Sequence, residues 1–586
     1  MTDLEQNDMI LSISDLEVSF GAASVIRDVN LTLDRGEILA LVGESGSGKS
    51  VLGRSILGLV PGNGRVSQGY IHFNGHDVTN PTTKDELRHL RGREIGLIFQ
   101  EPLSSLNPNL RIGEQMFEAM REHTDLSMRD IRERAIDMLK QVKLENPERL
   151  LNRYPHEFSG GMRQRIMIAS VMMLKPALLI ADEPTTALDA IVQHEVLNIM
   201  AEVARAHGTA VILISHDLAA VAAFAQRIAV MEKGELVETG DTDEVLRRPN
   251  HDYTKRLLAS TQLGVAAPIA GTDSTPLLAV DDLSIDFVEK RLFGLLGQNV
   301  NHAVRNVSLA IRPGEFVGLV GESGSGKSTI GRAIAKLVPQ VSGTVRFDDT
   351  NLGDCTVAEE YMLRRRIRFV FQDPYSSLNP RMRIEQIVRE GLRFDRDLSK
   401  MEKQARAMDM LAAVGLSADM ASRYPHALSG GQRQRVAIAR ALVSQPDLVI
   451  ADEPVSALDV TIQAQILDLL KNLQQKLGFA CLFISHDLHI VEQLCARLYV
   501  LHRGRVMEQA ETGTLFSAPR HPYTRRLMSA SPRLVQGLDG LELSMTALPV
   551  VAEQDRTDYY DAKDAAQPYQ LSEAAPGHFV ALQAGR

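Results

Sequence analysis

The chain has 586 residues, of which 44% are hydrophobic and 24% are charged, and its net charge is −10 at pH 7. This length exceeds what one ordinary hydrophobic core holds, so it predicts several domains. No basic excess indicates a nucleic-acid partner, and no apolar run approaches the roughly 18 residues that a membrane-spanning helix needs.

The first residues and the cysteines bear on the compartment. Residues 1–5 are acidic and lack the positive and apolar regions of a secretory signal, so we expect a cytosolic protein. Cys355, Cys481 and Cys495 form no Cys-x-x-Cys pair. We therefore expect reduced thiols rather than disulfides or a zinc site.

The first strongly patterned region joins a strand, a glycine-rich loop and a helix. Residues 38–42 are an apolar, strand-like run, and a helical apolar pattern follows the loop. The loop fits Gly-x-x-x-x-Gly-Lys-Ser, in which glycine N–H groups wrap a phosphate, the lysine reaches the outer phosphates and the serine meets Mg²⁺. A ligand-free glycine turn is the alternative, but the flanking strand and helix favour a nucleotide site. The predicted nucleotide-binding residues are Gly43, Glu44, Ser45, Gly46, Ser47, Gly48, Lys49, Ser50 and Val51.

Two shorter signals follow along the chain. A short apolar strand ends at Gln100, and further on Ser159 begins a predicted helix with Gly160 and Gly161 in its first turn. Serine caps such a helix, and the glycines expose backbone N–H groups at its positive end. This predicts a second anion site, which would be redundant if both sites served one phosphate.

Another apolar strand, residues 178–182, leads to two adjacent carboxylates. A strand buried in a parallel sheet presents its last residues at the edge where ligands bind. Asp182 suits Mg²⁺, and Glu183 can orient or deprotonate an attacking water. His216 ends the next strand, where a structural histidine is the alternative to a γ-phosphate contact.

The chain then repeats itself as a whole domain. Residues 262–276 are small, contain proline and glycine, and read as a flexible linker. The second copy lies 278 residues after the first at the lysines and 270 residues after it at the carboxylates and histidines. This predicts domains at residues 1–261 and 277–531, followed by a tail at 532–586. Because residues 553–567 are acidic and polar, we expect a disordered or regulatory tail.

The second copy supplies an equivalent set of candidates. They are Gly321, Glu322, Ser323, Gly324, Ser325, Gly326, Lys327, Ser328 and Thr329 in the loop, Gln372 at the strand end, Ser429, Gly430, Gly431 and Gln432 at the helix start, the carboxylates Asp452 and Glu453, and His486.

These motifs together resemble the ATP-binding cassette (ABC) family, whose signature is Leu-Ser-Gly-Gly-Gln. The resemblance covers residues 9–531. It implies an α/β fold of two tandem P-loop NTPase domains, each with a RecA-like mixed-sheet core, an antiparallel β subdomain and a helical subdomain. In that family two cassettes pair head to tail, and each signature closes on the ATP of the other. We therefore expect ATP and Mg²⁺ as ligands and intramolecular pairing of the two cassettes.

The resemblance also implies roles for single residues. Gln100 and Gln372 match the Q-loop glutamine, Asp189 and Asp459 match the aspartate after the catalytic pair, and His216 and His486 match the switch histidine. The implied catalytic residues are Glu183, Glu453, His216, His486, Gln100 and Gln372. The implied Mg²⁺ residues are Ser50, Gln100 and Asp182 in the first copy and Ser328, Gln372 and Asp452 in the second.

Two features differ from the family pattern or admit two interpretations: the adenine platform and the first signature. Alignment nominates Phe20 and Phe287 for stacking on adenine, but a core role is equally compatible, and Phe293 could substitute for Phe287. The first signature has Met162 in place of glutamine, which would weaken the site that combines it with Lys327 without disabling it.

Three further features resemble the importers of peptides and related solutes. Both Q-loops continue to Leu-Asn-Pro, both signatures follow Tyr-Pro-His, and both copies end in His-x-Tyr-Thr. The resemblance implies two transmembrane permease subunits and an extracytoplasmic solute-binding protein as partners, and a peripheral position on the cytoplasmic face of the inner membrane. No cysteine follows Cys495, so no iron–sulfur cluster is expected in the tail. The cargo, whether peptide, glutathione, nickel or an opine-like solute, is not encoded here.

The alternative is a soluble twin-cassette ATPase that acts on ribosomes or nucleic acid. Such translation factors place a long charged linker between cassettes, whereas this linker is short and weakly charged. Repair relatives carry zinc-type cysteine clusters, which this sequence lacks.

Overall fold

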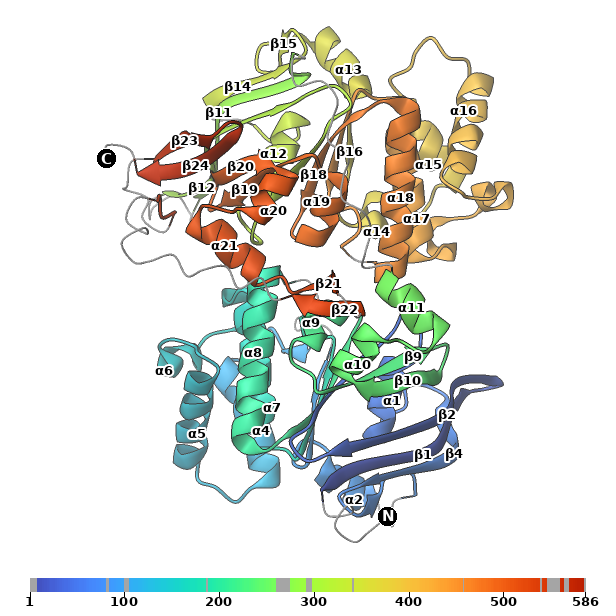
Figure 1. Ribbon diagram of the computed structural model, residues 1–586, viewed down its shortest axis with the longest axis vertical. Coiled ribbons are helices and arrows are strands. Elements are labelled where there is room, and N and C mark those ends of the chain that lie inside the picture. The colour runs from blue at the N-terminus through green and yellow to red at the C-terminus, as the bar shows by residue number, and fades with distance from the viewer. Residues whose placement is uncertain are drawn as a thin grey trace. The chain divides into compact units, whose positions relative to one another are not determined.

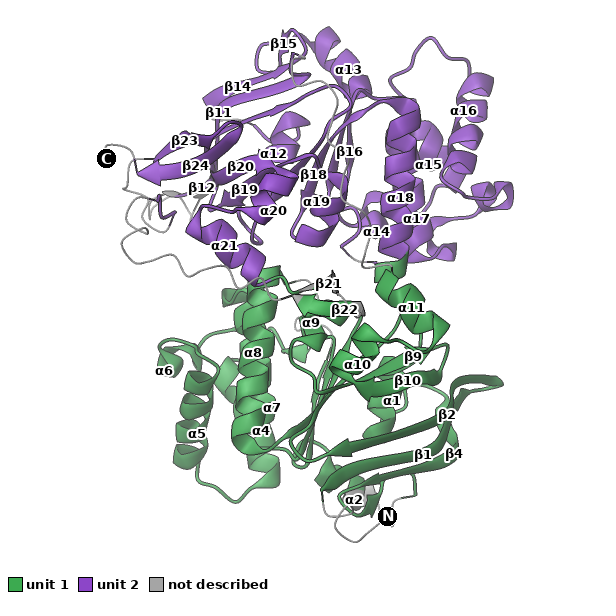
Figure 2. Ribbon diagram, in the orientation of Figure 1, with its two compact units in different colours: residues 1–262, 459–461, 531–545 green, residues 263–458, 462–530, 546–586 purple. Residues whose placement is uncertain are grey.

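The computed structural model describes residues 8–80, 84–99, 105–185, 188–259, 275–290, 298–339, 342–456, 458–537, 540–544, 559–562 and 569–583. The chain forms two compact units, coloured separately in Figure 2. Unit 1 comprises residues 1–262, 459–461 and 531–545, and unit 2 comprises residues 263–458, 462–530 and 546–586. Of the predicted linker, only residues 275 and 276 are among the described residues.

Unit 1 is built on a mixed sheet with strand order β10-β9-β3-β8-β7-β6. Its strands are β3 (Ile38–Val42), β6 (Ile95–Ile98), β7 (Leu178–Asp182), β8 (Ala210–Ser215), β9 (Arg227–Glu232) and β10 (Glu235–Asp241). Every residue of β3, β7 and β8 is buried, as expected for parallel strands covered on both faces. The register pairs Val42 with Ser215 and Asp182 with Ile214, so the carboxyl ends of these strands share one edge.

A second, antiparallel sheet covers one face of unit 1. Its order is β2-β1-β4-β5, with β1 (Met9–Phe20), β2 (Ala23–Asp34), β4 (Gly64–Phe73) and β5 (His76–Asp77). Its inward side chains share a core with β3 and with helix α1 (Lys49–Ile56), for example through Leu11, Leu41 and Leu52. The glycine-rich loop before α1 therefore starts from a strand that is held on both sides.

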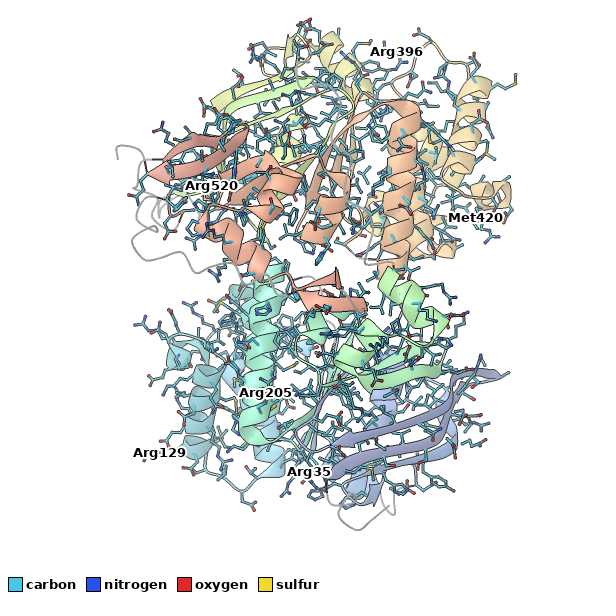
Figure 3. All side chains as sticks on the ribbon, in the orientation of Figure 1. Arg35, Arg129, Arg205, Arg396, Met420 and Arg520 are labelled. Atoms are coloured by element: carbon cyan, nitrogen blue, oxygen red, sulfur yellow. The ribbon has the colours of Figure 1, made fainter. Side chains whose placement is uncertain are left out.

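Most helices of unit 1 gather on the other face of the mixed sheet (Figure 1). They are α4 (Ile112–His123), α5 (Met128–Gln141), α6 (Pro147–Leu150), α7 (Gly160–Met172), α8 (Ala190–His207), α9 (Leu218–Ala222), α10 (Thr242–Arg247) and α11 (Asp252–Ala259). Helix α2 (Lys84–Leu90) instead packs with α1 in the core beside the antiparallel sheet, where Leu90 is buried. In α5, Ile131, Ala135 and Met138 recur at helical spacing and are buried in this core. The opposite face carries Arg129, labelled in Figure 3, which pairs with Glu133 at 3.1 Å.

Unit 2 repeats this plan. Its antiparallel sheet has the order β12-β11-β14-β15, and its mixed sheet has the order β16-β17-β18-β13-β19-β20-β24-β23. The strands are β11 (Leu278–Lys290), β12 (Gln298–Ile311), β13 (Phe316–Val320), β14 (Ser342–Phe347), β15 (Thr350–Asn351), β16 (Ile367–Val370), β17 (Leu448–Asp452), β18 (Ala480–Ser485), β19 (Arg497–His502) and β20 (Arg505–Glu511). The helices are α12 (Lys327–Ile334), α13 (Val357–Arg366), α14 (Pro374–Ser377), α15 (Ile384–Glu390), α16 (Lys400–Ala413), α17 (Gly430–Leu442), α18 (Val460–Leu477), α19 (Leu488–Leu494), α20 (Thr512–Ser517) and α21 (Pro522–Ser529).

The tail contributes strands that the sequence did not lead us to expect. β21 (Arg533–Gly537) and β22 (Gly540–Ser544) form an antiparallel pair that belongs to unit 1, where Leu541 joins the helical core. β23 (Tyr569–Ala575) and β24 (His578–Gln583) extend the mixed sheet of unit 2 at β20. All four strands lie within residues 532–586, where we expected a disordered or regulatory tail. Of its acidic segment, residues 553–567, only 559–562 are described, and a regulatory role stays a prediction.

Candidate active sites

The two glycine-rich loops adopt a backbone that only glycine accommodates at their first residue. Gly43 has φ of 151°, and a Cβ there would lie 2.2 Å from the carbonyl oxygen of Met231. Gly321 has φ of 148°, and its Cβ would lie 2.0 Å from the carbonyl oxygen of Leu501. This left-handed, crowded position turns the chain from strand to helix and exposes the loop N–H groups.

Each loop lysine folds back over its own loop. Lys49 Nζ donates to the carbonyl oxygens of Gly43 at 2.7 Å and Glu44 at 2.8 Å. Lys327 Nζ makes the same two bonds, to Gly321 at 2.8 Å and Glu322 at 2.7 Å. Burial lowers the pKa of Lys49, although the nearby carboxylates oppose the shift. Each ammonium thus lies within the cradle that a triphosphate would occupy.

A serine and an aspartate form a candidate Mg²⁺ site in each unit. Ser50 Oγ donates to Asp182 Oδ1 at 2.8 Å, and Ser328 Oγ donates to Asp452 Oδ1 at 2.7 Å. Burial raises the pKa of both aspartates. Asp452 Oδ2 is buried and has no hydrogen-bond partner among the described residues. A hydroxyl beside an orphaned carboxylate oxygen is a donor set that fits Mg²⁺.

The glutamates that follow these aspartates face the strand-end histidines. His216 Nδ1 lies 3.3 Å from Glu183 Oε1, and His486 Nδ1 lies 3.1 Å from Glu453 Oε1. Burial alone would lower the pKa of each histidine, but its hydrogen bond with the glutamate raises it. Conversely, burial would raise the pKa of Glu453, and the bond with His486 outweighs this and lowers it.

The backbone of both glutamates is in the left-handed region, with φ of 47° at Glu183 and 46° at Glu453. Such a conformation is costly for a residue with a side chain, and it persists only where its surroundings fix it. Here each glutamate N–H donates to the neighbouring strand, to Ile214 O at 3.0 Å and to Ile484 O at 2.9 Å. The bend turns the carboxylate toward the histidine.

Of the two Q-loop glutamines, only the one in the second copy lies among the described residues. Gln372 Nε2 donates to Glu453 Oε2 at 2.8 Å, so the structure brings this residue to the carboxylate that we predicted to be catalytic. Gln100 lies outside the described residues.

The signature serines cap their helices, but the two caps differ. Ser159 Oγ accepts the Met162 N–H at 3.4 Å, and Ser429 Oγ accepts the Gln432 N–H at 3.4 Å. Gln432 Oε1 also accepts the Ser429 N–H at 3.0 Å, which completes a capping box. Met162 offers no such acceptor and packs against the apolar core of unit 1.

The remaining signature residues and the following aspartates lie at helix starts. Gly160 and Gly430 begin α7 and α17, and Asp189 caps α8 by accepting the Val192 N–H at 3.1 Å. Gly161 and Gly431 are tightly packed, because a Cβ at Gly161 would lie 2.3 Å from Val192 and one at Gly431 2.6 Å from Ile462. Asp459 directly precedes α18.

A cavity of about 570 Å³ in unit 2 brings several predicted residues together. Its lining includes Ser323, Gly324, Gly326, Lys327, Ser328 and Thr329 of the loop, together with Gln372 and Glu453. The signature residues Ser429 to Gln432 are not among its described lining residues.

Phe287 also lines this cavity and is 41% exposed, so it is not a core residue. Its stacking on adenine stays a prediction. Phe20 differs, because it is partly buried against the apolar core, beside Gly64. Phe293, the other candidate in the second copy, lies outside the described residues.

Sequence reasoning missed a tyrosine in each unit. Tyr253 Oη accepts the Glu44 N–H at 2.9 Å, and Tyr523 Oη accepts the Glu322 N–H at 3.1 Å. Burial raises the pKa of Tyr253 to about 12, so its hydroxyl stays protonated. The repeated His-x-Tyr-Thr motif was the available signal, but nothing in its spacing indicates a contact with a loop about two hundred residues away.

Comparisons with known proteins agree with this geometry. A family model described as ABC transporter matches residues 26–186 and 304–456, and one described as oligopeptide/dipeptide transporter, C-terminal region, matches residues 237–264 and 507–557. The peptidoglycan transport ATP-binding protein YejF of Agrobacterium fabrum is 43% identical over 530 residues, which is 89% of this chain and 96% of that protein. The glutathione import ATP-binding protein GsiA of Escherichia coli O157:H7 is 41% identical over 559 residues, 89% of either chain.

Among solved structures, a dimeric post-hydrolysis state of the ATP-binding cassette MJ0796 with ADP and Pi is 32% identical. It covers 40% of this chain and 98% of its own, with a TM-score of 0.36. The sequence matches confirm the family resemblance and the tandem-cassette fold drawn from the motifs. The chain belongs to the ABC transporter family and is an ATP-hydrolysing, ATP-binding subunit with two tandem cassettes.

Proposed function

We propose that this chain drives uptake of a peptide or a related small solute, by hydrolysing ATP at two sites. It would act through two transmembrane permease subunits, supplied with solute by an extracytoplasmic binding protein, from the cytoplasmic face of the inner membrane. The match to an oligopeptide/dipeptide transporter region in both halves supports this cargo class, as do relatives named for glutathione import and peptidoglycan transport. In the described residues, no helix has the length and hydropathy to cross a bilayer.

The single observation that carries the proposal is that the same constellation of charged and polar side chains recurs in both cassettes. A buried loop lysine, a serine–aspartate pair and a glutamate–histidine pair recur in both units with nearly the same distances. We therefore assign ATP hydrolysis to both cassettes.

Separate groups of residues would bind the phosphates and the metal ion. Lys49 and Lys327 would exchange their loop carbonyls for the outer phosphate oxygens, while loop N–H groups hold the chain of phosphates. Ser50 with Asp182, and Ser328 with Asp452, would hold Mg²⁺. When bound, this ion neutralises charge on the phosphates.

The glutamates act on the water. Glu453 is held between His486 and Gln372, so one carboxylate oxygen faces each partner. A lowered pKa keeps Glu453 ionised and able to accept a proton from the attacking water. His486, with its raised pKa, would donate to the γ-phosphate. Glu183 and His216 have the same roles in the first cassette.

Two cassettes in one chain would pair with each other. By the family pattern, the first site combines Lys49 and Glu183 with the signature from Ser429 to Gln432, and the second combines Lys327 and Glu453 with the signature from Ser159 to Met162. Covalent linkage keeps the partner cassette at a high effective concentration. Closure on ATP and release after hydrolysis would move the permease subunits.

Gentle affinity purification from native membranes, with mass spectrometry and an ATPase assay, tests the proposal. Two polytopic membrane proteins in equal amounts with this chain are the expected result. The chain with Lys49→Ala and Lys327→Ala serves as the control for the ATPase signal. Recovery with ribosomal proteins, or only from the soluble fraction, would instead favour the soluble twin-cassette ATPase.

A further inference from the structure

The tail reaches the nucleotide cavity of the second cassette. Tyr560 and Ala562 line the same cavity as Lys327 and Ser328. They belong to a part of the chain that lies beyond the repeated cassette, so nothing in the first cassette corresponds to them in sequence. The tail therefore makes the second site chemically different from the first.

The backbone of Tyr560 is bound on both sides. Its N–H donates to Ala581 O at 3.2 Å, and its carbonyl lies 3.0 Å from His521 Nε2. His521 Nδ1 accepts the Tyr523 N–H at 3.1 Å, so Nε2 carries the proton and donates to Tyr560. Tyr523 in turn accepts the N–H of Glu322 in the glycine loop. A continuous set of hydrogen bonds thus joins the tail to the phosphate-binding loop.

Arg505 fixes the ring of Tyr560. Its guanidinium lies 5.3 Å from the Tyr560 ring centre and 4.7 Å from that of Tyr569, and the two rings meet edge to face at 5.2 Å. Arg505 also lines the cavity. The equivalent position in the first cassette is Glu235, which faces Arg27 at 3.9 Å and has no positive charge to place between two rings.

Strand β24 joins the tail to the unit 2 sheet by pairing with β20, next to the edge strand β23 (Figure 1). His578 Nε2 lies 2.7 Å from Glu508 Oε1, and both side chains are fully buried. Glu508 also accepts the backbone N–H groups of Arg520, labelled in Figure 3, and His521. A buried carboxylate with three donors fixes the geometry of this edge, because leaving any of them unpaired is costly.

The cavity lining indicates which part of a nucleotide meets the tail. The loop residues and the pair Gln372 and Glu453 account for the phosphates and the water. The remaining lining is mixed: it has the smaller residues Asn301, Ala303 and Ala562, the aromatic rings of Phe287, His302 and Tyr560, and the guanidinium groups of Arg305, Arg503 and Arg505. Such groups suit the π-faces of a purine base.

We propose that Tyr560 to Ala562 form part of the base-binding wall of the second nucleotide site, so that docking of the tail raises ATP affinity at that cassette alone. This inference rests on the proposed nucleotide site in unit 2. The occupant is the base and ribose of the bound ATP, and the tail acts as an added binding element.

The test measures ATP binding by calorimetry on the full chain with Lys49→Ala. This substitution removes ATP binding at the first site, so the measured affinity is that of the second site. Tyr560→Ala and Arg505→Glu should each weaken ATP binding about tenfold, since base–aromatic contacts are of that order. Tyr560→Phe, which keeps the ring beside Arg505, should retain affinity within about twofold. Glu542→Ala, a tail substitution outside the cavity lining, is the matched control and should have no effect.

Inorganic tripolyphosphate serves as a second probe, because it lacks the base. Its affinity should be unchanged in Tyr560→Ala. If Tyr560→Ala reduced the affinities for tripolyphosphate and ATP equally, the base contact would be wrong, because the substitution would have disrupted the whole site. ATP affinity unchanged in Tyr560→Ala would also overturn it, as would an equal loss in Tyr560→Phe. If Lys327→Ala in the same background left ATP binding intact, the nucleotide site itself would be wrong, which is a distinguishable failure.

Discussion

The two glutamates that we propose as catalytic bases are positioned by single residues around them. Glu183 and Glu453 leave buried strands in a left-handed turn and face a histidine at hydrogen-bond distance. The strained turn and the histidine place the carboxylate beside the phosphate cradle. Replacing the carboxylate by an amide keeps the shape and removes the proton acceptor.

The double substitution Glu183→Gln with Glu453→Gln should therefore bind ATP at near-normal affinity while its turnover falls at least about a hundredfold. Phosphate release and nucleotide binding, measured on the same preparation, give the two readouts. Glu195→Gln changes a half-buried glutamate that is paired with Arg165 outside the predicted catalytic set, and this control should keep its activity. Turnover close to that of the unmodified chain would contradict the assignment of these bases.

Tyr253 and Tyr523 make the same contact in the two cassettes, so their substitutions can be compared directly. Tyr523→Phe removes the acceptor for the Glu322 N–H, and Tyr253→Phe does the same for Glu44. An unsatisfied buried N–H costs about 1–3 kcal/mol, so we expect each change to weaken ATP binding at its own cassette about fivefold or more.

In each measurement the loop lysine of the other cassette is replaced by alanine. Calorimetry then gives the effect of each tyrosine substitution on ATP affinity separately. The exposed Tyr424→Phe should behave as the unmodified chain. A tyrosine effect that appeared equally at both cassettes would argue against a local contact.

At the scale of elements, the signature helices differ by one cap. Helix α17 has a complete capping box through Gln432, whereas α7 has Met162 at the same place. A missing cap bond is worth about 0.5–2 kcal/mol and leaves the Ser159 N–H without this partner side chain.

Exchanging the residues at positions 162 and 432 tests whether the difference between the two helix caps affects ATP turnover. Met162→Gln should raise ATP turnover about twofold to threefold, and Gln432→Met should lower it by a similar factor, because each changes the cap at one signature. Steady-state ATPase rates at saturating ATP provide the measurement. Equal, unchanged rates in both variants would show that this side chain does not influence turnover.

The elements also show how much of the fold could be predicted from the sequence. The glycine loops, the Asp–Glu strand ends and the signature helices follow local patterns, and the structure contains a strand or helix at each of them. The tail strands could not be found in this way. β24 forms by pairing with β20, and its anchor His578 meets Glu508 across 70 residues. Such contacts depend on an available sheet edge rather than on local composition.

At the scale of the whole molecule, the path of the chain is not a simple succession of two cassettes. After the last helix of the second cassette, residues 531–545 belong to unit 1, and residues 546–586 belong to unit 2. Leu541 is 8% exposed within the core of the first cassette. Unit 1 is therefore completed by residues from the far end of the chain.

A chain cut at a protease site inserted within residues 262–276 should stay together as two fragments. The second fragment still carries β21 and β22, whose Leu541 is buried in unit 1 and whose Leu534 and Leu543 pack against the same core. Full burial of one leucine contributes about 1.5–3 kcal/mol, so the three together favour association of the fragments. Size-exclusion chromatography after cleavage checks this, and Leu541→Asp should release the fragments more readily. Gln570→Ala, on an exposed position of β23, is the control. Complete separation with Leu541 intact would contradict the expectation.

The same path has a consequence for synthesis on the ribosome. Proteins emerge from the amino end, and early domains usually fold while later ones are still being made. Here the first cassette lacks β21 and β22 until residue 544 has been translated, long after its own residues 1–262. A prematurely terminated product would leave the apolar side of α10, with Val245 and Leu246, uncovered by β22. Chaperones and proteases recognise such surface, so the order of translation itself distinguishes finished molecules from incomplete ones.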